Sequence, residues 1–131
     1  MSLAAPSSAS AAVYYVSPSG SDSGPGSAAA PWRTLSHVRD AALAPGSRVL
    51  LRRGATWREQ LVIERSGTRA SPIVIGAYGS GAAPRITASD CIKVKGSYVV
   101  VQALAVDHCT RAGVTVQGLS LIHISEPTRP Y

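Results

Sequence analysis

The chain has 131 residues, of which 45% are hydrophobic and 15% are charged, a composition that is ordinary for one soluble globular domain. Its formal net charge of +6 comes mainly from arginine, and Arg52-Arg53 is the densest basic point. Because nucleic-acid binding needs basic side chains clustered on one element, this dispersed charge argues against a nucleic-acid partner and leaves an acidic polysaccharide open. A membrane-spanning helix is excluded, since no run of about 18 apolar residues occurs.

The first twelve residues, Met1 to Ala12, are small, polar and rich in alanine and serine. An Ala-Ser-Ala or Ser-Ala-Ala step would suit a signal peptidase, but the basic and apolar regions of a secretory signal are missing. Residues 1–12 are therefore interpreted as either the remnant of a signal peptide or a low-complexity leader.

Ordered structure is expected from residue 13 onward. Residues 13–16 have the composition of a strand, and residues 17–30 form a loop of Gly, Ser, Pro and Asp. An amphipathic helix is predicted over residues 34–44, ended by Pro45-Gly46. Its apolar stripe is formed by Leu35, Val38, Ala41 and Ala42.

Three short apolar runs dominate the next part of the chain, at residues 49–51, 61–63 and 73–75, and they begin at equal intervals. This interval is too short for an intervening helix, and no Asn-Gly or Asp-Gly hairpin signal separates the runs. We therefore expect a coil of parallel strands rather than a meander. Further short strands are predicted at residues 85–87, 92–94, 98–101, 104–106 and 114–116.

Similar positions return from Ile73 to Ile92 and again from Ile92 to Val114, at intervals of about 20 residues that are typical of a parallel β-solenoid. The helix would cover the unpaired backbone groups and apolar side chains of the first coil. The expected inward positions are Val49 or Leu50, Leu61 or Val62 with Ile63, Ile73 with Ile75, Ile92 with Val94, and Val114 with Val116.

Cys91 and Cys109 are the two cysteines of the chain. Their separation along the chain is close to the length of one coil, so a disulfide is permitted. The preferred interpretation is two small buried thiols, or one buried thiol and one in a turn. The spacing does not suit zinc, for which only His37, His108 and His123 could assist.

Several motifs in a fixed order carry a resemblance to a known superfamily. They are Tyr14-Tyr15-Val16-Ser17-Pro18-Ser19-Gly20-Ser21-Asp22, Pro31-Trp32-Arg33-Thr34-Leu35, Arg52-Arg53-Gly54-Ala55-Thr56-Trp57-Arg58-Glu59, Ser66-Gly67-Thr68 and Pro72-Ile73-Val74-Ile75-Gly76-Ala77-Tyr78. Over about residues 13–118 the chain resembles the opening of right-handed parallel β-helix proteins of the pectate-lyase-like superfamily.

The resemblance implies an all-β fold, a right-handed parallel β-helix with an N-terminal amphipathic capping helix. It also implies a secreted or cell-surface protein, because the superfamily is dominated by secreted polysaccharide lyases and glycoside hydrolases. Their catalytic residues usually lie on later coils, as carboxylates that hold calcium or as a Lys, Arg or paired Asp in the cleft. Nothing in this sequence matches those residues.

The last thirteen residues, Leu119 to Tyr131, abandon the glycine-punctuated strand pattern. Residues 119–129 resemble a conceptual translation of the adapter used in transposase-based sequencing libraries, residue for residue. The alternative is a native strand over residues 119–124 followed by a proline-ended tail. We therefore expect residues 13–118 to be the N-terminal part of a β-helix domain that is truncated after a few coils, and residues 119–131 to be a non-native tail.

Asp107-His108-Cys109 is the densest polar constellation, with Arg111 nearby. Asp107 and His108 are the catalytic candidates, as a general base or nucleophile. Adjacent residues in a turn point in different directions, so a hydrogen-bonded turn is the preferred interpretation. In the 17–30 loop, Asp22 is the candidate calcium ligand, although it has no acidic companion.

Two further residue pairs could contribute chemistry. Trp32 and Trp57 could stack on sugar rings, but packing is the preferred role for both. Glu59 and Glu64 lie at an odd spacing around a strand, which sends their side chains to opposite faces. They are therefore not expected to act as paired carboxylates.

The function expected from these observations is that of an N-terminal, non-catalytic portion of a secreted carbohydrate-active β-helix protein, a polysaccharide lyase or glycoside hydrolase. The alternative is a non-enzymatic surface adhesin or glycan-binding module. Polysaccharide is the expected partner through the parent protein, and no cofactor is expected here, with calcium left open for the full-length parent. Expressed alone, the chain is expected to be inactive on polysaccharides and to self-associate through an exposed solenoid end.

Overall fold

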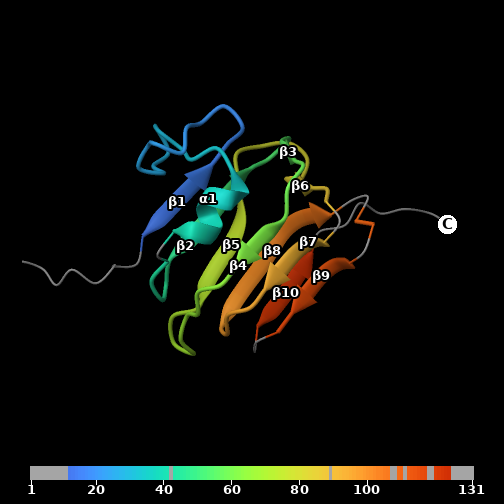
Figure 1. Ribbon diagram of the computed structural model, residues 1–131. Helices are drawn as coiled ribbons and strands as arrows, with labels where there is room; N and C mark the ends of the chain where they lie inside the picture. Colours follow the sequence, from blue (N-terminus) through green and yellow to red (C-terminus); the bar gives the residue numbers. More distant parts are fainter. Residues whose placement is uncertain are drawn as a thin grey trace, which may run out of the picture.

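The computed structural model describes residues 12–41, 43–88, 90–106, 109–110, 112–117 and 120–124, and β-strands dominate this part of the chain (Figure 1). The described residues form ten strands and one short helix. In chain order the elements are β1 (Val13–Val16), α1 (Leu35–Asp40), β2 (Arg48–Arg52), β3 (Thr56–Trp57), β4 (Leu61–Ile63), β5 (Ile73–Tyr78), β6 (Arg85–Ile86), β7 (Asp90–Val94), β8 (Val99–Val106), β9 (Ala112–Val116) and β10 (Leu121–Ile124).

Every strand pairing within the described residues is parallel, and the pairings form three ladders. The first ladder joins β1, β2, β5, the beginning of β8 and β10. The second joins β3, β6 and the end of β8, and the third joins β4, β7 and β9. Because β8 belongs to two ladders, the first and second ladders form one curled sheet. No antiparallel hairpin connects the described strands, which agrees with the expected coil of parallel strands.

The chain visits the three ladders in the same order in each circuit, so each strand pairs with its counterpart in the next circuit. In the first ladder Arg48 pairs with Val74, and in the third Ile92 pairs with Val114. The described part is therefore consistent with a partial solenoid. The interval from Ile73 to Ile92 was wrongly assigned to one coil, because Ile73 lies in the first ladder and Ile92 in the third.

Strand β8 changes ladder at Ala103. Val101 pairs with Ile75 of β5, whereas Ala105 pairs with Arg85 of β6. Between them Ala103 adopts a left-handed backbone conformation with φ of 62°. The two strands predicted at residues 98–101 and 104–106 therefore form one bent strand, and β3, which is only two residues long, was not predicted.

The interior is built from one alternating set of side chains in each ladder. Val49, Ile75 and Val101 occupy one register row of the first ladder, and all three are fully buried. Burial of each such side chain contributes about 1.5–3 kcal/mol of transfer free energy. The predicted inward positions are confirmed for Val49, Leu61, Ile63, Ile73, Ile75, Ile92 and Val94. Val62, the alternative to Leu61, is buried but lies outside the core cluster.

Val116 departs from the predicted inward set. Its side chain is 38% exposed, and Val114 is only partly buried. Both lie on β9, which is the last described strand of the third ladder and is covered by no further strand from the described residues. The alternating apolar pattern therefore extends to β9, where no further described strand packs against the ladder to bury these side chains.

The N-terminal elements pack against the first strands of the three ladders or, in the case of β1, begin a ladder. Strand β1 pairs with β2, and α1 packs against β4. At the second ladder the indole Nε1–H of Trp57 on β3 donates to the Arg33 carbonyl oxygen at 3.0 Å. The helix therefore covers the first coil at the third ladder, which is part of the role expected of it.

Helix α1 is shorter than the predicted residues 34–44. Thr34 is its N-cap and accepts a hydrogen bond from the His37 amide, while Leu35 and Val38 are buried. The backbone becomes extended at Ala41, with ψ of 144°. This change in direction places Leu43 in the core, so packing ends the helix before the Pro45-Gly46 signal is reached.

Gly96 permits close stacking of two successive coils at the corner between the third and first ladders. A Cβ atom at this position would collide with the carbonyl group of Arg65, from the preceding coil. The Lys95 amide donates to Ile63 O at 2.8 Å in the same corner. Glycine is therefore required here for steric reasons.

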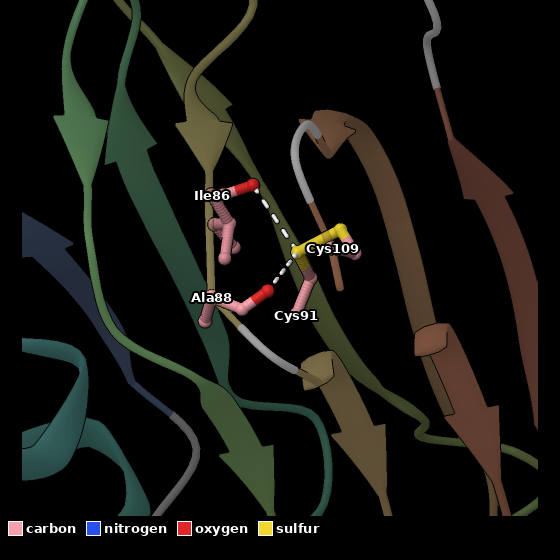
Figure 2. The surroundings of a disulfide bond; sticks show 4 residues. All are labelled: Ile86, Ala88, Cys91 and Cys109. Atoms are coloured by element: carbon pink, nitrogen blue, oxygen red, sulfur yellow. Dashed lines mark hydrogen bonds between the residues drawn. A yellow bond between two sulfur atoms is a disulfide. The ribbon is translucent and has the colours of Figure 1, made fainter. Parts of the chain in front are cut away.

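Cys91 and Cys109 form a disulfide with a Cα–Cα distance of 5.7 Å (Figure 2). The preferred interpretation as thiols was therefore wrong. Cys91 lies on β7 directly after the corner that follows β6, and Cys109 lies in the corresponding corner after β8, one coil later. The Cys91 sulfur also lies 3.4 Å from the Ile86 carbonyl oxygen, a contact rather than a hydrogen bond because a disulfide sulfur carries no hydrogen.

Candidate functional site

The described surface contains an open groove of about 440 Å³ at the carboxyl ends of β1 and β2. One wall is formed by residues 17–19, directly after β1, and the other by residues 52–55, at the end of β2. The two walls meet because β1 and β2 are adjacent parallel strands, with Val16 paired to Leu51. Parallel pairing brings both strand ends to the same edge of the sheet.

The first wall is held by hydrogen bonds from Ser17. Its amide donates to the Trp32 carbonyl oxygen at 2.8 Å, and its hydroxyl lies 3.0 Å from that of Ser19. The Ser19 amide also donates to the Ser17 hydroxyl at 3.3 Å. Ser17 is buried and Ser19 is exposed, so their hydrogen bonds fix the exposed residue of the wall to a buried one.

The second wall is held by the next coil. The Arg53 amide donates to the Tyr78 carbonyl oxygen at 2.9 Å, and the Gly54 amide donates to Ala82 O at 2.8 Å. Gly54 adopts a φ of +81°, a conformation that favours glycine, and no atom lies within 4 Å of the position that a Cβ would occupy. The backbone of this wall is therefore fixed while the space beside it stays open.

An aromatic pair lies on the outer side of the first ladder, on the two strands that flank β2. Tyr15 pairs with Leu50 and Tyr78 pairs with Arg52, positions that alternate with the buried Val49 and Leu51. The two tyrosine rings are 5.0 Å apart between centroids at an interplanar angle of 88°. Both side chains are partly exposed.

The electrostatic character of the groove comes from two arginines. Arg52 is exposed and Arg53 is half-buried. The ion pairs given by the described residues instead join Glu64 to Arg39 at 3.3 Å and to Lys95 at 3.5 Å. No carboxylate of the described part lines the groove, which therefore carries positive charge.

Asp22, the candidate calcium ligand, fixes the start of α1. Its Oδ1 accepts from the amides of Arg33 and Thr34 at 2.8 and 2.9 Å, and its Oδ2 accepts from the Thr34 hydroxyl at 2.7 Å. Partial desolvation acts to raise the pKa of Asp22, but these hydrogen bonds and the nearby His37 outweigh it and hold the pKa below its ordinary value. The ionised carboxylate is thus the form that the fold stabilises.

The catalytic candidates Asp107 and His108 lie outside the described residues. Within the part that the structure describes, no three His, Cys, Asp or Glu side chains gather to hold a metal ion. No helix among these residues is long and apolar enough to cross a membrane.

The tryptophans and glutamates have structural contacts. Trp32 and Trp57 are 6% and 4% exposed, and the Trp32 indole N–H donates to the Gly24 carbonyl oxygen. Glu59 accepts from the amide and hydroxyl of Ser36 at 3.1 and 3.0 Å, whereas Glu64 pairs with basic side chains. The tryptophans therefore pack, and the two glutamates bind separate partners, as the sequence predicted.

Arg52-Arg53 is the densest basic point of the sequence, but the sequence pattern assigns no site to it. It could not place this step beside Ser17 or join Tyr15 to Tyr78, because neither relationship is local in sequence. The available signal was a paired arginine at a strand end followed by glycine, in a segment that already carries the superfamily resemblance.

Comparison with known proteins gives one sequence relative and several similar structures. No protein-family model matches the chain. The uncharacterized protein YwoF of Bacillus subtilis (strain 168) is 34% identical over 122 residues, an alignment that covers 81% of this chain and 26% of YwoF. The chain thus spans about a quarter of the length of this relative.

Two crystal structures of the GH136 lacto-N-biosidase from Eubacterium ramulus resemble the fold. The native protein has a TM-score of 0.70 and 28% identity, covering 73% of this chain and 20% of that chain. The selenomethionine derivative has a TM-score of 0.73 and 25% identity, covering 86% of this chain and 26% of that chain. A rhamnogalacturonan lyase has a TM-score of 0.60 and 23% identity, covering 72% of this chain and 28% of that chain. This likeness concerns the fold alone. The described part of the chain therefore shares a curled, all-parallel β-sheet with carbohydrate-active proteins.

Proposed function

We propose that the chain is the N-terminal part of a secreted carbohydrate-active protein, a polysaccharide lyase or glycoside hydrolase with a right-handed parallel β-helix. The observation that carries this proposal is the likeness to the lacto-N-biosidase, at 28% identity and a TM-score of 0.70 over 73% of this chain. In this proposal the described coils support or bind glycan, and the catalytic residues belong to the rest of the protein. In the same proposal, residues 119–131 are a tail that is not native to the protein.

The strand pairings support the proposed β-helix. Three parallel ladders are revisited in constant order, and a parallel crossover connection within a sheet is right-handed in about 98% of cases. The superfamily resemblance over residues 13–118 points the same way.

Secretion is supported by the Cys91–Cys109 disulfide. Disulfides form and persist in oxidising compartments, whereas cytosolic thiols are kept reduced. The expected location of the parent protein is therefore outside the cell or on its surface.

The test uses the full-length parent protein and a panel of pectin, alginate, rhamnogalacturonan, glycosaminoglycans and neutral oligosaccharides. A hydrolase releases new reducing ends alone, while a lyase also creates unsaturated products that absorb in the ultraviolet. Turnover of any member supports the proposal, and loss of turnover after chelation would assign calcium to the parent. A full-length protein that binds no glycan and cleaves none would overturn the proposal.

A non-enzymatic glycan-binding module is the second candidate. It is favoured by the Tyr15–Tyr78 pair, whose side chains are partly exposed on the two strands that flank β2, with Tyr78 the register partner of Arg52. Aromatic side chains provide rigid apolar surface with a polar end, which suits contact with sugar rings. Glycan binding without turnover by the full-length protein would favour this candidate.

The contribution of the aromatic pair can be measured with the Tyr78→Ala variant. We expect this change to weaken glycan binding by about tenfold, equivalent to about 1.4 kcal/mol. Tyr98, which is exposed on another corner, provides the control variant Tyr98→Ala. Equal losses in both variants would show that the Tyr15–Tyr78 surface has no special role.

A further inference from the structure

The groove between residues 17–19 and residues 52–55 has a lining that suits an anion. Its charged members are Arg52 and Arg53, and Ser17 and Ser19 also line it. A guanidinium presents a planar fork of N–H donors that matches the oxygens of a carboxylate or sulfate. The lining therefore fits an acidic ligand better than a neutral one.

Three carboxylates of the described part bind partners outside the groove. Asp22 accepts hydrogen bonds from Thr34 and Arg33, and Glu59 accepts from Ser36. Glu64 pairs with Arg39 and Lys95. Among the described residues, no ion pair is formed by either arginine of the groove, and their charge is available to a ligand.

The Tyr15–Tyr78 pair is connected to the groove lining by strand register and by one backbone hydrogen bond. Arg52 is the register partner of Tyr78, and the Arg53 amide donates to the Tyr78 carbonyl oxygen at 2.9 Å. On the other side Tyr15 lies two residues before Ser17, in the strand that leads into the first wall. Positive charge and aromatic surface therefore meet at one edge of the sheet.

We infer that this groove binds an anionic sugar unit of a polysaccharide. Arg52 and Arg53 hold its carboxylate or sulfate, and its ring lies against the tyrosine pair. The inference takes a polysaccharide as the ligand from the proposed function. It adds that the sugar unit bound by this part of the chain is anionic. It predicts discrimination between acidic and neutral glycans by the described coils themselves.

The experiment titrates the full chain by calorimetry with three tetrasaccharides, namely tetragalacturonate, a chondroitin sulfate tetrasaccharide and cellotetraose. At least one anionic ligand should bind about tenfold or more tightly than cellotetraose, since charge-assisted hydrogen bonds are roughly twice as strong as neutral ones. The stronger of the two anionic ligands identifies carboxylate or sulfate as the group that is held. Added salt should weaken this binding.

Charge-removing variants locate the site. Arg52→Gln and Arg53→Gln should each weaken binding of the preferred anionic tetrasaccharide by about tenfold and leave cellotetraose binding unchanged. Arg69→Gln removes the same charge from an exposed loop outside the groove and should have no effect. Circular dichroism of each variant establishes that the fold is retained.

The inference is overturned by equal affinity for acidic and neutral tetrasaccharides, by absence of anionic binding, or by an equal loss in Arg69→Gln. None of these results decides the proposed function, which is tested by turnover of the full-length protein. Conversely, selective binding of an anionic tetrasaccharide by the chain supports the inference even when the full-length protein shows no turnover.

Discussion

The Asp22 carboxylate binds Thr34 twice, accepting from its amide at 2.9 Å and from its hydroxyl at 2.7 Å. The same hydroxyl accepts from the His37 amide at 3.2 Å, which makes Thr34 the N-cap of α1. A loop residue twelve positions upstream thus fixes the point at which the capping helix begins. Since α1 packs against β4, this contact also positions the helix on the first strand of the third ladder.

Removal of this carboxylate should destabilise the fold. Asp22→Ala leaves the Thr34 and Arg33 donors without their acceptor, and we expect the free energy of unfolding to fall by about 1–2 kcal/mol at neutral pH. Chemical denaturation measures the change. Asp40→Asn, at an exposed position, is the control and should change the free energy by less than about 0.5 kcal/mol.

The Asp22 contribution should also depend on pH. Its folded-state pKa lies below the ordinary value of 3.8, so the ionised form stabilises the fold above the unfolded-state pKa. This stabilisation is lost as the pH falls through the folded-state pKa. The stability difference between the wild type and Asp22→Ala should therefore shrink between about pH 5 and about pH 2. A difference that stays constant over this range would contradict the assignment.

A charge placed under the helix should be poorly tolerated. Val38 is 1% exposed, and Val38→Asp would bury a carboxylate among apolar side chains without a partner. We expect a loss of about 3 kcal/mol or more in the free energy of unfolding, with a lower melting temperature. The matched change Val13→Asp, at a position 44% exposed, should cost less than about 1 kcal/mol. An unchanged melting temperature for Val38→Asp would be incompatible with the helix packing described.

The disulfide should stabilise the coil that it closes. Cys91 and Cys109 have a sequence separation of 18, for which the chain-entropy estimate is about 3 kcal/mol. Denaturation of the Cys91→Ser, Cys109→Ser double variant should show a loss of this order. Reductant should lower the stability of the wild type and leave the double variant unchanged. Equal sensitivity of both proteins to reductant would rule out the bond as the cause.

The end of the third ladder should promote association. Val116 on β9 is 38% exposed, and no further strand from the described residues covers this edge. Val116→Lys should reduce light scattering at high protein concentration. Gln117→Lys adds the same charge without removing apolar surface and separates the two effects. If Gln117→Lys reduces scattering as much as Val116→Lys, net charge and not the exposed valine controls association.

Local patterns predicted the existence of most strands because short β-branched runs bounded by glycine, serine and proline have few other stable conformations. Leu61–Ile63 was predicted with its observed bounds, and Val13–Val16 likewise. Strand β3 escaped prediction because two residues, Thr56–Trp57, are too few to establish a period. The helix was predicted too long because its stripe continued past Asp40, while burial of Leu43 required an extended backbone.

The sequence by itself determined the predominance of strands and the buried positions of its middle strands, since both follow from residue spacing of a few positions. The absence of hairpin signals between the apolar runs also predicted that the strands are parallel. Only the tertiary structure decided which runs share a ladder, because equal spacing along the chain does not say where a corner turns. That choice brings Cys91 to Cys109 across one coil, and Tyr15 to Tyr78 across β2. The groove beside Arg52 has the same origin: its walls are far apart in sequence and meet because β1 and β2 end at one edge.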